Sequence, residues 1–215
     1  MLTGREINAV LDLAASALAP PRCLACASTI PAADRLCRCC RADLVRHPAP
    51  PLAIDGADSA KAAFSYEGAA RDLVAALKFK RLLAAAEIAA EAIAALLPPG
   101  VDGTVVPVPG SRLRSRRRGF DPAALIAARL VDRAPLELEQ PLRRLDLGRQ
   151  RGNSRAARLE QPPRIGLVAT PPSVALLIDD VTTTGATLSA CAAALRSGGT
   201  DGVWAFSFAA APLLR

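Results

Sequence analysis

Apolar and polar residues follow one another along this chain in blocks that predict strands followed by helices. Four short apolar runs predict buried strands, because each is bounded by turn residues and is too short for a helix. They are residues 62–66, 104–108, 174–178 and 203–208. Ala- and Leu-rich segments from Gly68 to Leu97 predict helices, and Asp121 followed by Pro122 is typical of a helix start. Strands that alternate with helices imply a mostly parallel sheet and an α/β fold.

Three other segments lack such a pattern in the body of the chain. Residues 111–120 read SRLRSRRRGF, with five Arg, and are expected to form a loop. Residues 140–172 are rich in Arg and contain five Pro, which predicts a long mobile loop. The Pro-rich stretch 47–52 predicts a domain boundary near residue 50. We therefore expect a small N-terminal part, residues 1–50, and a larger domain, residues 51–215.

The N-terminal part combines a predicted helix with a cluster of cysteines. Helical spacing is shown by Ile7, Val10, Leu11, Ala14 and Leu18. Five of the six Cys lie between residues 23 and 40, where two CxxC turns are formed by Cys23, Cys26, Cys37 and Cys40. Two such turns supply the four thiolates that a structural zinc ion takes. Cys39 is a spare thiol that competes with Cys37 or Cys40, and reduced or disulfide-paired cysteines are the alternative to a metal.

The stretch LLIDDVTTTGAT, residues 176–187, is the most informative part of the chain. A buried strand ends in two adjacent carboxylates, Asp179 and Asp180, and a hydroxyl-rich turn leads into a helix. A helix N-terminus offers unpaired N–H groups to an anion. The predicted phosphate-binding residues are Thr182, Thr183, Thr184, Gly185, Ala186 and Thr187. The carboxylates suit sugar hydroxyls or a magnesium ion, and an ordinary strand-to-helix turn is the alternative reading.

Charge and composition narrow the class of ligand. The net charge is +7, and residues 112–164 hold 14 Arg and 6 acidic residues, which makes 14 − 6 = +8 for that segment alone. Clustered Arg suits bidentate binding of phosphate, although an Arg-rich composition of the genome gives a similar bias. Arg5, Glu6 and Asp12 interrupt any signal-peptide pattern, and no apolar run reaches the roughly 20 residues of a membrane span. We expect a soluble cytoplasmic protein without membrane insertion, with Cys191 in the core and His47 in a loop.

Four motifs, in this order, resemble those of the ComF family. They are the paired CxxC turns, FSYEGAARDLVAALKFK, VVPVPGSRLRSRRRGFDPAALIA and LLIDDVTTTGATL. The last motif by itself resembles the diphosphosugar-binding signature of type I phosphoribosyltransferases. The resemblance implies a type I phosphoribosyltransferase-like parallel sheet flanked by helices, joined to a zinc-bearing N-terminal part, and an association with DNA uptake. It also implies that residues 150–158 form the family's mobile loop. The pyrophosphate-side residues that it implies are Pro109, Ser111, Arg112, Arg116, Arg117 and Arg118.

Two functions follow from these motifs and remain open at this point. The first is a phosphoribosyltransferase that binds phosphoribosyl pyrophosphate with Mg²⁺, with Asp179 and Asp180 as catalytic residues on the ribose hydroxyls and an unknown acceptor. The second is a single-stranded DNA-binding protein that retains the sugar-phosphate site as a ligand sensor. A weaker third reading is a structural partner of competence-machinery proteins. Backbone charge would carry DNA binding, because only 3% of the residues are aromatic.

Overall fold

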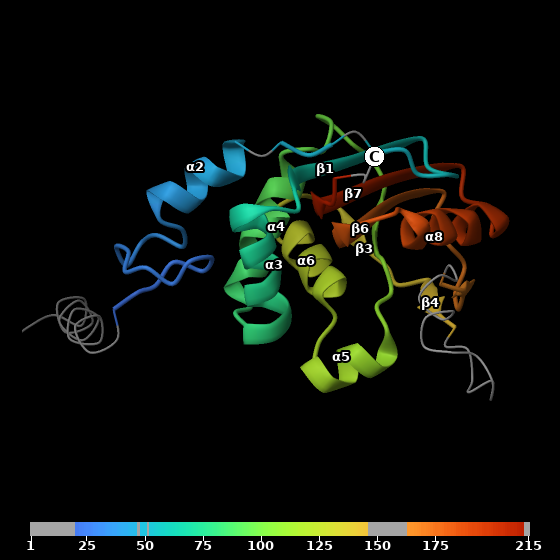
Figure 1. Ribbon diagram of the computed structural model, residues 1–215. Helices are drawn as coiled ribbons and strands as arrows, with labels where there is room; N and C mark the ends of the chain where they lie inside the picture. Colours follow the sequence, from blue (N-terminus) through green and yellow to red (C-terminus); the bar gives the residue numbers. More distant parts are fainter. Residues whose placement is uncertain (1–19, 47, 51, 146–162, 213–215) are drawn as a thin grey trace, which may run out of the picture.

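The computed structural model describes residues 20–46, 48–50, 52–145 and 163–212. It contains the helices and strands that Figure 1 labels. The helices are α2 (Arg38–Arg46), α3 (Gly68–Lys80), α4 (Ala84–Ala94), α5 (Arg112–Arg118), α6 (Pro122–Val131) and α8 (Ala186–Ser197). The strands are β1 (Ser59–Ser65), β2 (Thr104–Pro107), β3 (Glu137–Leu138), β4 (Leu142–Arg144), β5 (Ile165–Leu167), β6 (Val174–Thr182) and β7 (Gly202–Ala210). The predicted N-terminal helix lies outside the described residues.

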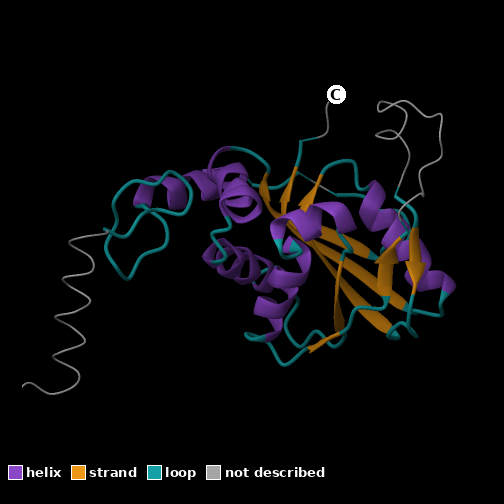
Figure 2. Ribbon diagram, turned by 90° about the horizontal axis from the view of Figure 1, so that it is seen from below, coloured by secondary structure: helices purple, strands orange, loops and turns teal. Residues whose placement is uncertain are grey.

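Five strands form one sheet in the order β1-β7-β6-β2-β3, and every neighbouring pair in it is parallel. The strands lie side by side in Figure 2, with helices flanking them. Parallel sheets are buried on both faces, which is why the central strands are apolar almost throughout. The predicted α/β fold with a parallel sheet flanked by helices is therefore confirmed.

The two faces of the sheet are covered by different helices. Figure 1 shows α3, α4 and α6 gathered together, apart from α8. Side chains alternate along a strand, so β6 serves both layers: Leu176 and Ile178 pack with α3, α4 and α6, whereas Ala175 and Leu177 pack with α8. The described chain thus has two apolar layers separated by the sheet.

The connections create a reversal of strand order between β2 and β6. The chain leaves β2 through α6 to β3 on one side, and leaves β6 through α8 to β7 on the other. Because α6 and α8 cover opposite faces, a crevice opens between the carboxyl ends of these two strands. Ligands of open α/β sheets bind at such a point. Pro107 ends β2 there, and the Thr-rich turn follows β6.

The prediction of a loop at residues 111–120 was wrong. Arg112–Arg118 form the helix α5, and Gly119 ends it in the left-handed conformation with φ +89. Arg has nearly the helix propensity of Leu, so a run of Arg followed by Gly is consistent with a short helix. The five Arg therefore project from a helix instead of a loop.

The prediction for residues 140–172 was wrong at both ends of the segment. Strands β4 and β5 pair antiparallel there, from Leu142 opposite Leu167 to Arg144 opposite Ile165. Residues 146–162, which include the segment that resembles the mobile loop, lie outside the described residues. Strand β6 also runs on to Thr182, so Asp179 and Asp180 lie within a strand rather than after it.

The N-terminal part contains a short helix that the cysteine pattern did not predict. Helix α2 begins at Arg38, between the second pair of cysteines, and packs beside α3 at the outer edge of the molecule in Figure 1. Among the described residues, no helix is long and apolar enough to cross a membrane. The proposed boundary near residue 50 stays a prediction.

Candidate functional site

A cleft of about 340 Å³ lies at the carboxyl ends of β2 and β6. It brings together side chains from α3, α5, the turn after β2, β4 and β6. Its charged lining residues are Lys78, Arg114, Arg118, Asp121, Arg144, Asp179 and Asp180, and Tyr66, Phe79, Pro109, Ser111 and Thr187 lie among them. The four cations and three acids share a small volume, so the cleft suits a ligand that is both anionic and rich in hydroxyls.

The two adjacent carboxylates face different layers of the protein although both line the cleft. Successive side chains of a strand point to opposite faces. Asp180 lies on the face of α3, where its Oδ2 is 2.6 Å from Nζ of Lys78. Asp179 lies toward α8, and its charge adds to the burial that raises the pKa of Cys191. The pair therefore approaches one ligand from two directions.

Lys78 is the partner of Asp180 that the sequence analysis missed. Asp180 is 7% exposed, and a carboxylate so buried needs a counter-ion. The ammonium comes from the last turn of α3, while the carboxylate belongs to a strand far along the chain. The segment FSYEGAARDLVAALKFK contained the lysine, but only the fold shows which carboxylate it meets.

The surroundings of Asp179 differ from those of Asp180. Burial raises the pKa of Asp179 well above its usual range, and the charge of Asp180 acts in the same direction. The backbone N–H of Asp180 donates to Oδ1 of Asp179 at 2.8 Å and opposes that rise in pKa. The two neighbouring carboxyl groups therefore have unlike environments, because Asp180 pairs with the ammonium of Lys78 and Asp179 accepts a backbone N–H.

The predicted phosphate residues surround a small hollow of about 30 Å³ at the start of α8. Residues 181–188 line it together with Asp179. Gly185 occupies the cap of α8 with φ +78, and a Cβ there would lie 2.6 Å from Cδ1 of Ile54. Oγ1 of Thr182 is buried without a hydrogen-bond partner. A buried hydroxyl that lacks a partner and a helix N-terminus at one hollow together fit an anionic oxygen.

Asp121 organises the other wall of the cleft. Its Oδ2 accepts the N–H of Gly110 at 2.9 Å and the hydroxyl of Ser115 at 3.2 Å, and its Oδ1 accepts the N–H of Ala123 at 3.1 Å. The predicted cap of α6 is thereby confirmed. A Cβ at Gly110 would lie 2.3 Å from Oδ2. One carboxylate thus joins the turn after β2 to both α5 and α6.

The structure divides the predicted pyrophosphate-side residues into two groups. Pro109, Ser111 and Arg118 line the main cleft, and Nε of Arg118 also donates to the carbonyl of Lys78 at 2.8 Å. Arg112 lines a neighbouring hollow of about 210 Å³ that shares Pro109 and Arg144 with the cleft. Arg116 and Arg117 are exposed and line neither cavity. Helical spacing explains this division, because only part of α5 faces the cleft.

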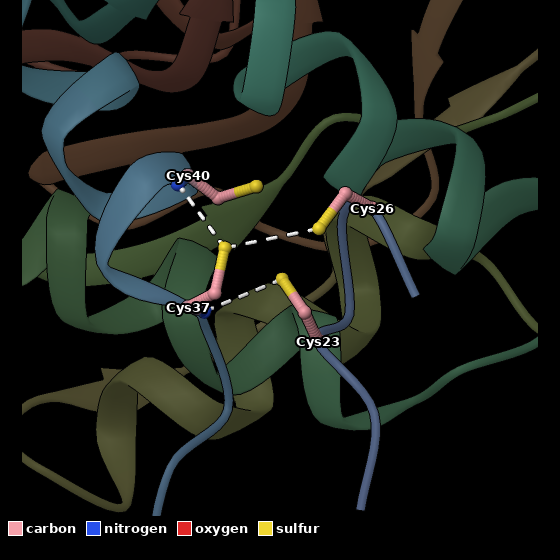
Figure 3. A group of neighbouring side chains, drawn as sticks. All are labelled: Cys23, Cys26, Cys37 and Cys40. Atoms are coloured by element: carbon pink, nitrogen blue, oxygen red, sulfur yellow. Dashed lines mark hydrogen bonds between the residues drawn. The ribbon is translucent and has the colours of Figure 1, made fainter. Parts of the chain in front are cut away.

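The four predicted metal ligands come together in the N-terminal part, as Figure 3 shows. The sulfurs of Cys23, Cys26, Cys37 and Cys40 all lie within 4.8 Å of one another. The sulfurs of Cys26 and Cys37 are 3.7 Å apart, close to the spacing of about 3.8 Å that follows from tetrahedral Zn–S bonds of about 2.3 Å. Cys39 is exposed and outside the cluster. The described cysteines form no disulfide.

Backbone and hydroxyl donors prepare this cluster for a cation. The N–H of Cys37 donates to the sulfur of Cys23, and the N–H of Cys40 donates to the sulfur of Cys37. A hydrogen bond with Ser28 lowers the pKa of Cys26 to about 6, and the N–H of Cys40 lowers the pKa of Cys37. Burial raises the pKa of the Cys40 thiol, so a metal must replace its proton. The four-Cys cluster can therefore bind zinc.

We expect about one zinc ion per chain, because four thiolates complete a structural site. Elemental analysis of protein purified without added metal measures it. Cys37→Ser removes the metal, whereas Cys39→Ser, the matched control, retains it. Equal zinc contents in these two variants would contradict the assignment. Chelation should loosen the N-terminal part first, since binding energy of a structural zinc is folding energy.

Asp179→Asn is expected to stabilise the protein at neutral pH by about 2–4 °C in melting temperature, the effect of roughly 1 kcal/mol in a chain of this size. Because the pKa of Asp179 is raised on folding, its ionisation opposes folding once the pH exceeds the ordinary carboxyl value of about 3.9. The melting temperature of Asp179→Asn should therefore exceed that of wild type near pH 7, and the difference should disappear below about pH 4. Thermal unfolding across pH measures it.

Asp180→Asn provides the contrast, because it leaves the ammonium of Lys78 without its counter-ion. This variant should melt below wild type at neutral pH. Two variants that melt alike would show that the carboxyl groups have the same environment.

Comparisons with known proteins leave the family of this chain unassigned. No family model matches it, and no curated protein matches it. Among solved structures, it is similar to one described as the allosteric regulatory enzyme of purine biosynthesis, with 18% identity and a TM-score of 0.38. That match covers 57% of this chain and 25% of the other, so the likeness extends over a quarter of the longer protein. The fold assignment therefore rests on the sheet topology described above.

Proposed function

We propose that the protein binds phosphoribosyl pyrophosphate in the cleft between β2 and β6, as a phosphoribosyltransferase-like protein of the ComF type. One observation carries this proposal: a pair of acids, a Thr-rich helix start and Arg side chains meet at one edge of the sheet. A sugar with a phosphate at one end and a pyrophosphate at the other needs these three elements in this order. An association with DNA uptake and with competence-machinery proteins is implied only by the resemblance of the sequence motifs to the ComF family.

Each wall of the cleft has a distinct task in this proposal. The hollow at the start of α8 takes the 5′-phosphate, and the carboxyl groups of Asp179 and Asp180 hold the ribose hydroxyls. Arg114 and Arg118 meet the pyrophosphate beside the turn that Asp121 holds. During transfer the bond from C1 to pyrophosphate would break with positive charge developing on the sugar, and the pyrophosphate would leave with the electron pair beside Arg114 and Arg118, which stabilise its negative charge. The proposal names no acceptor molecule for the ribosyl phosphate group.

The carboxyl groups do not by themselves form a magnesium site. Asp180 is already paired with Lys78, and the raised pKa of Asp179 disfavours its charged form. Mg²⁺ prefers several hard oxygen ligands and keeps its waters. A Mg²⁺ ion would therefore be held chiefly by the pyrophosphate of the ligand, and it would supply positive charge to the leaving group.

Combined Asp179→Asn and Asp180→Asn substitutions should weaken binding of phosphoribosyl pyrophosphate at least about a hundredfold. The reason is that each hydrogen bond from a ribose hydroxyl to a carboxyl group becomes a weaker one to a neutral amide, and that the ammonium of Lys78 is left in the cleft without its counter-ion. Calorimetric titration in the presence of Mg²⁺ measures the affinity, and a pyrophosphate-release assay across candidate bases tests for turnover.

Asp201→Asn is the matched control, because this carboxylate lies just before β7, at the opposite end of the sheet. It should bind as wild type does. Circular dichroism establishes that the double variant is folded. Retained affinity in a folded double variant would place the ligand elsewhere.

The exposed side of α5 favours a second function, binding of single-stranded DNA. The helix has five Arg in seven residues and no acid, and Arg116 and Arg117 point away from the cleft. Phe79 is 78% exposed at the rim of the cleft, the one exposed aromatic side chain among the seven of this chain. Cationic side chains beside an exposed ring suit the backbone and bases of a single strand.

Arg116→Ala with Arg117→Ala should weaken DNA binding and lower the salt slope by up to about two, since each lost phosphate contact removes roughly one. Affinity for phosphoribosyl pyrophosphate should not change, because neither side chain lines the cleft. Filter binding over a salt series measures the slope. Arg38→Ala with Arg41→Ala makes the same charge change on α2 and is the control. DNA affinity that is independent of salt would refute backbone binding.

A further inference from the structure

Helix α3 is capped by a residue of another element. Its own N-cap position, Glu67, makes no side-chain cap hydrogen bond. Instead Oδ2 of Asp43, on α2, accepts the N–H of Ala69 at 2.7 Å. Gly68 has φ +43, and a Cβ there would lie 2.1 Å from that oxygen. The first turn of α3 is therefore built around the carboxylate of Asp43.

Asp43 belongs to the segment that carries the four-Cys cluster. Helix α2 begins at Arg38, directly after Cys37, and Cys40 lies in its first turn. A metal held by these two cysteines would fix that turn of α2. The position of Asp43, one turn further along the same helix, then depends on the cluster.

The other end of α3 lies in the cleft. Lys78, in its last turn, pairs with Asp180 at 2.6 Å. The carbonyl of Lys78 accepts Nε of Arg118 at 2.8 Å, and the guanidinium of Arg81 donates to the carbonyl of Arg117 at 2.9 Å. The end of α3 thus contacts both the acidic pair and the Arg-rich helix α5.

We propose that Asp43 is a positioning residue for the cleft. Helix α3 has 13 residues and is about 20 Å long, and it packs against the sheet between the two contacts. By holding the first turn of α3, Asp43 sets where Lys78 lies against Asp180. The four-Cys segment thereby influences the affinity of the cleft for its ligand, whose identity rests on the proposed function.

The first test needs no ligand and uses hydrogen exchange of the zinc-loaded protein, read by mass spectrometry. Asp43→Ala should raise exchange along α3 as far as its last turn and in α5. Asp43→Asn keeps an acceptor oxygen for Ala69 and should resemble wild type. Arg46→Ala removes the ion pair between Arg46 and Asp43, at 3.7 Å, keeps the acceptor for Ala69, and is the matched control. A rise confined to the first turn of α3 would overturn the proposal.

The second test is a double-mutant cycle on binding of phosphoribosyl pyrophosphate. Asp43→Ala should weaken binding about fivefold, a typical size for a coupling effect, while the zinc content stays at wild-type level. In a Lys78→Met background the same substitution should have no further effect, because the contact that it positions is gone. A purely structural role would give additive effects, and additivity would overturn the proposal.

The two tests separate the inference from the proposed function. A wild-type protein that does not bind phosphoribosyl pyrophosphate would refute the function, and the exchange experiment would still decide the role of Asp43. Normal ligand binding with unchanged exchange in Asp43→Ala would refute the inference alone.

Discussion

The cleft depends on one constraint of topology: neighbouring strands β2 and β6 send their connections to opposite faces of the sheet. Helix α6 follows β2 on one face, and α8 follows β6 on the other. Helices α6 and α8 therefore diverge at the carboxyl ends of these two strands, and polar side chains, together with the short helix α5, line the crevice that opens there. Every group that we assign to the ligand lies at this point because of that reversal.

Most of the carboxyl groups of the cleft have a counter-ion or hydrogen-bond donors beside them. The carboxylate of Asp180 has the ammonium of Lys78, and Asp121 accepts three hydrogen bonds from three separate segments. Buried charges cost stability unless they are paired in this way. Asp179 is the exception, and its raised pKa records the cost. A buried acid whose pKa stays raised although it accepts a backbone N–H is typical, at a cleft, of a group that serves a ligand.

The N-terminal part is joined to the sheet domain by defined contacts and not by apolar packing alone. Backbone N–H groups donate to the sulfurs of the four-Cys cluster, which can hold a metal. Helix α2 begins within this cluster, directly after Cys37. Helix α2 then meets α3 through Asp43. A short segment whose four-Cys cluster can bind a metal thus contacts the same helix that supplies Lys78 to the cleft.

Local sequence determined the parts of this protein that short-range chemistry controls. The CxxC spacing predicted the cluster, the apolar runs predicted the central strands, and the Asp and Thr residues at the end of β6 marked the edge of the sheet where the cleft lies. Tertiary structure decided the partners: Lys78 for Asp180, Asp43 for Ala69, and Asp121 for Gly110. These pairs join segments that only the crossing of the chain over the sheet brings together. Even the helical form of Arg112–Arg118 was undecided locally, because a short Arg-rich segment is stable as a helix only where its ends are held.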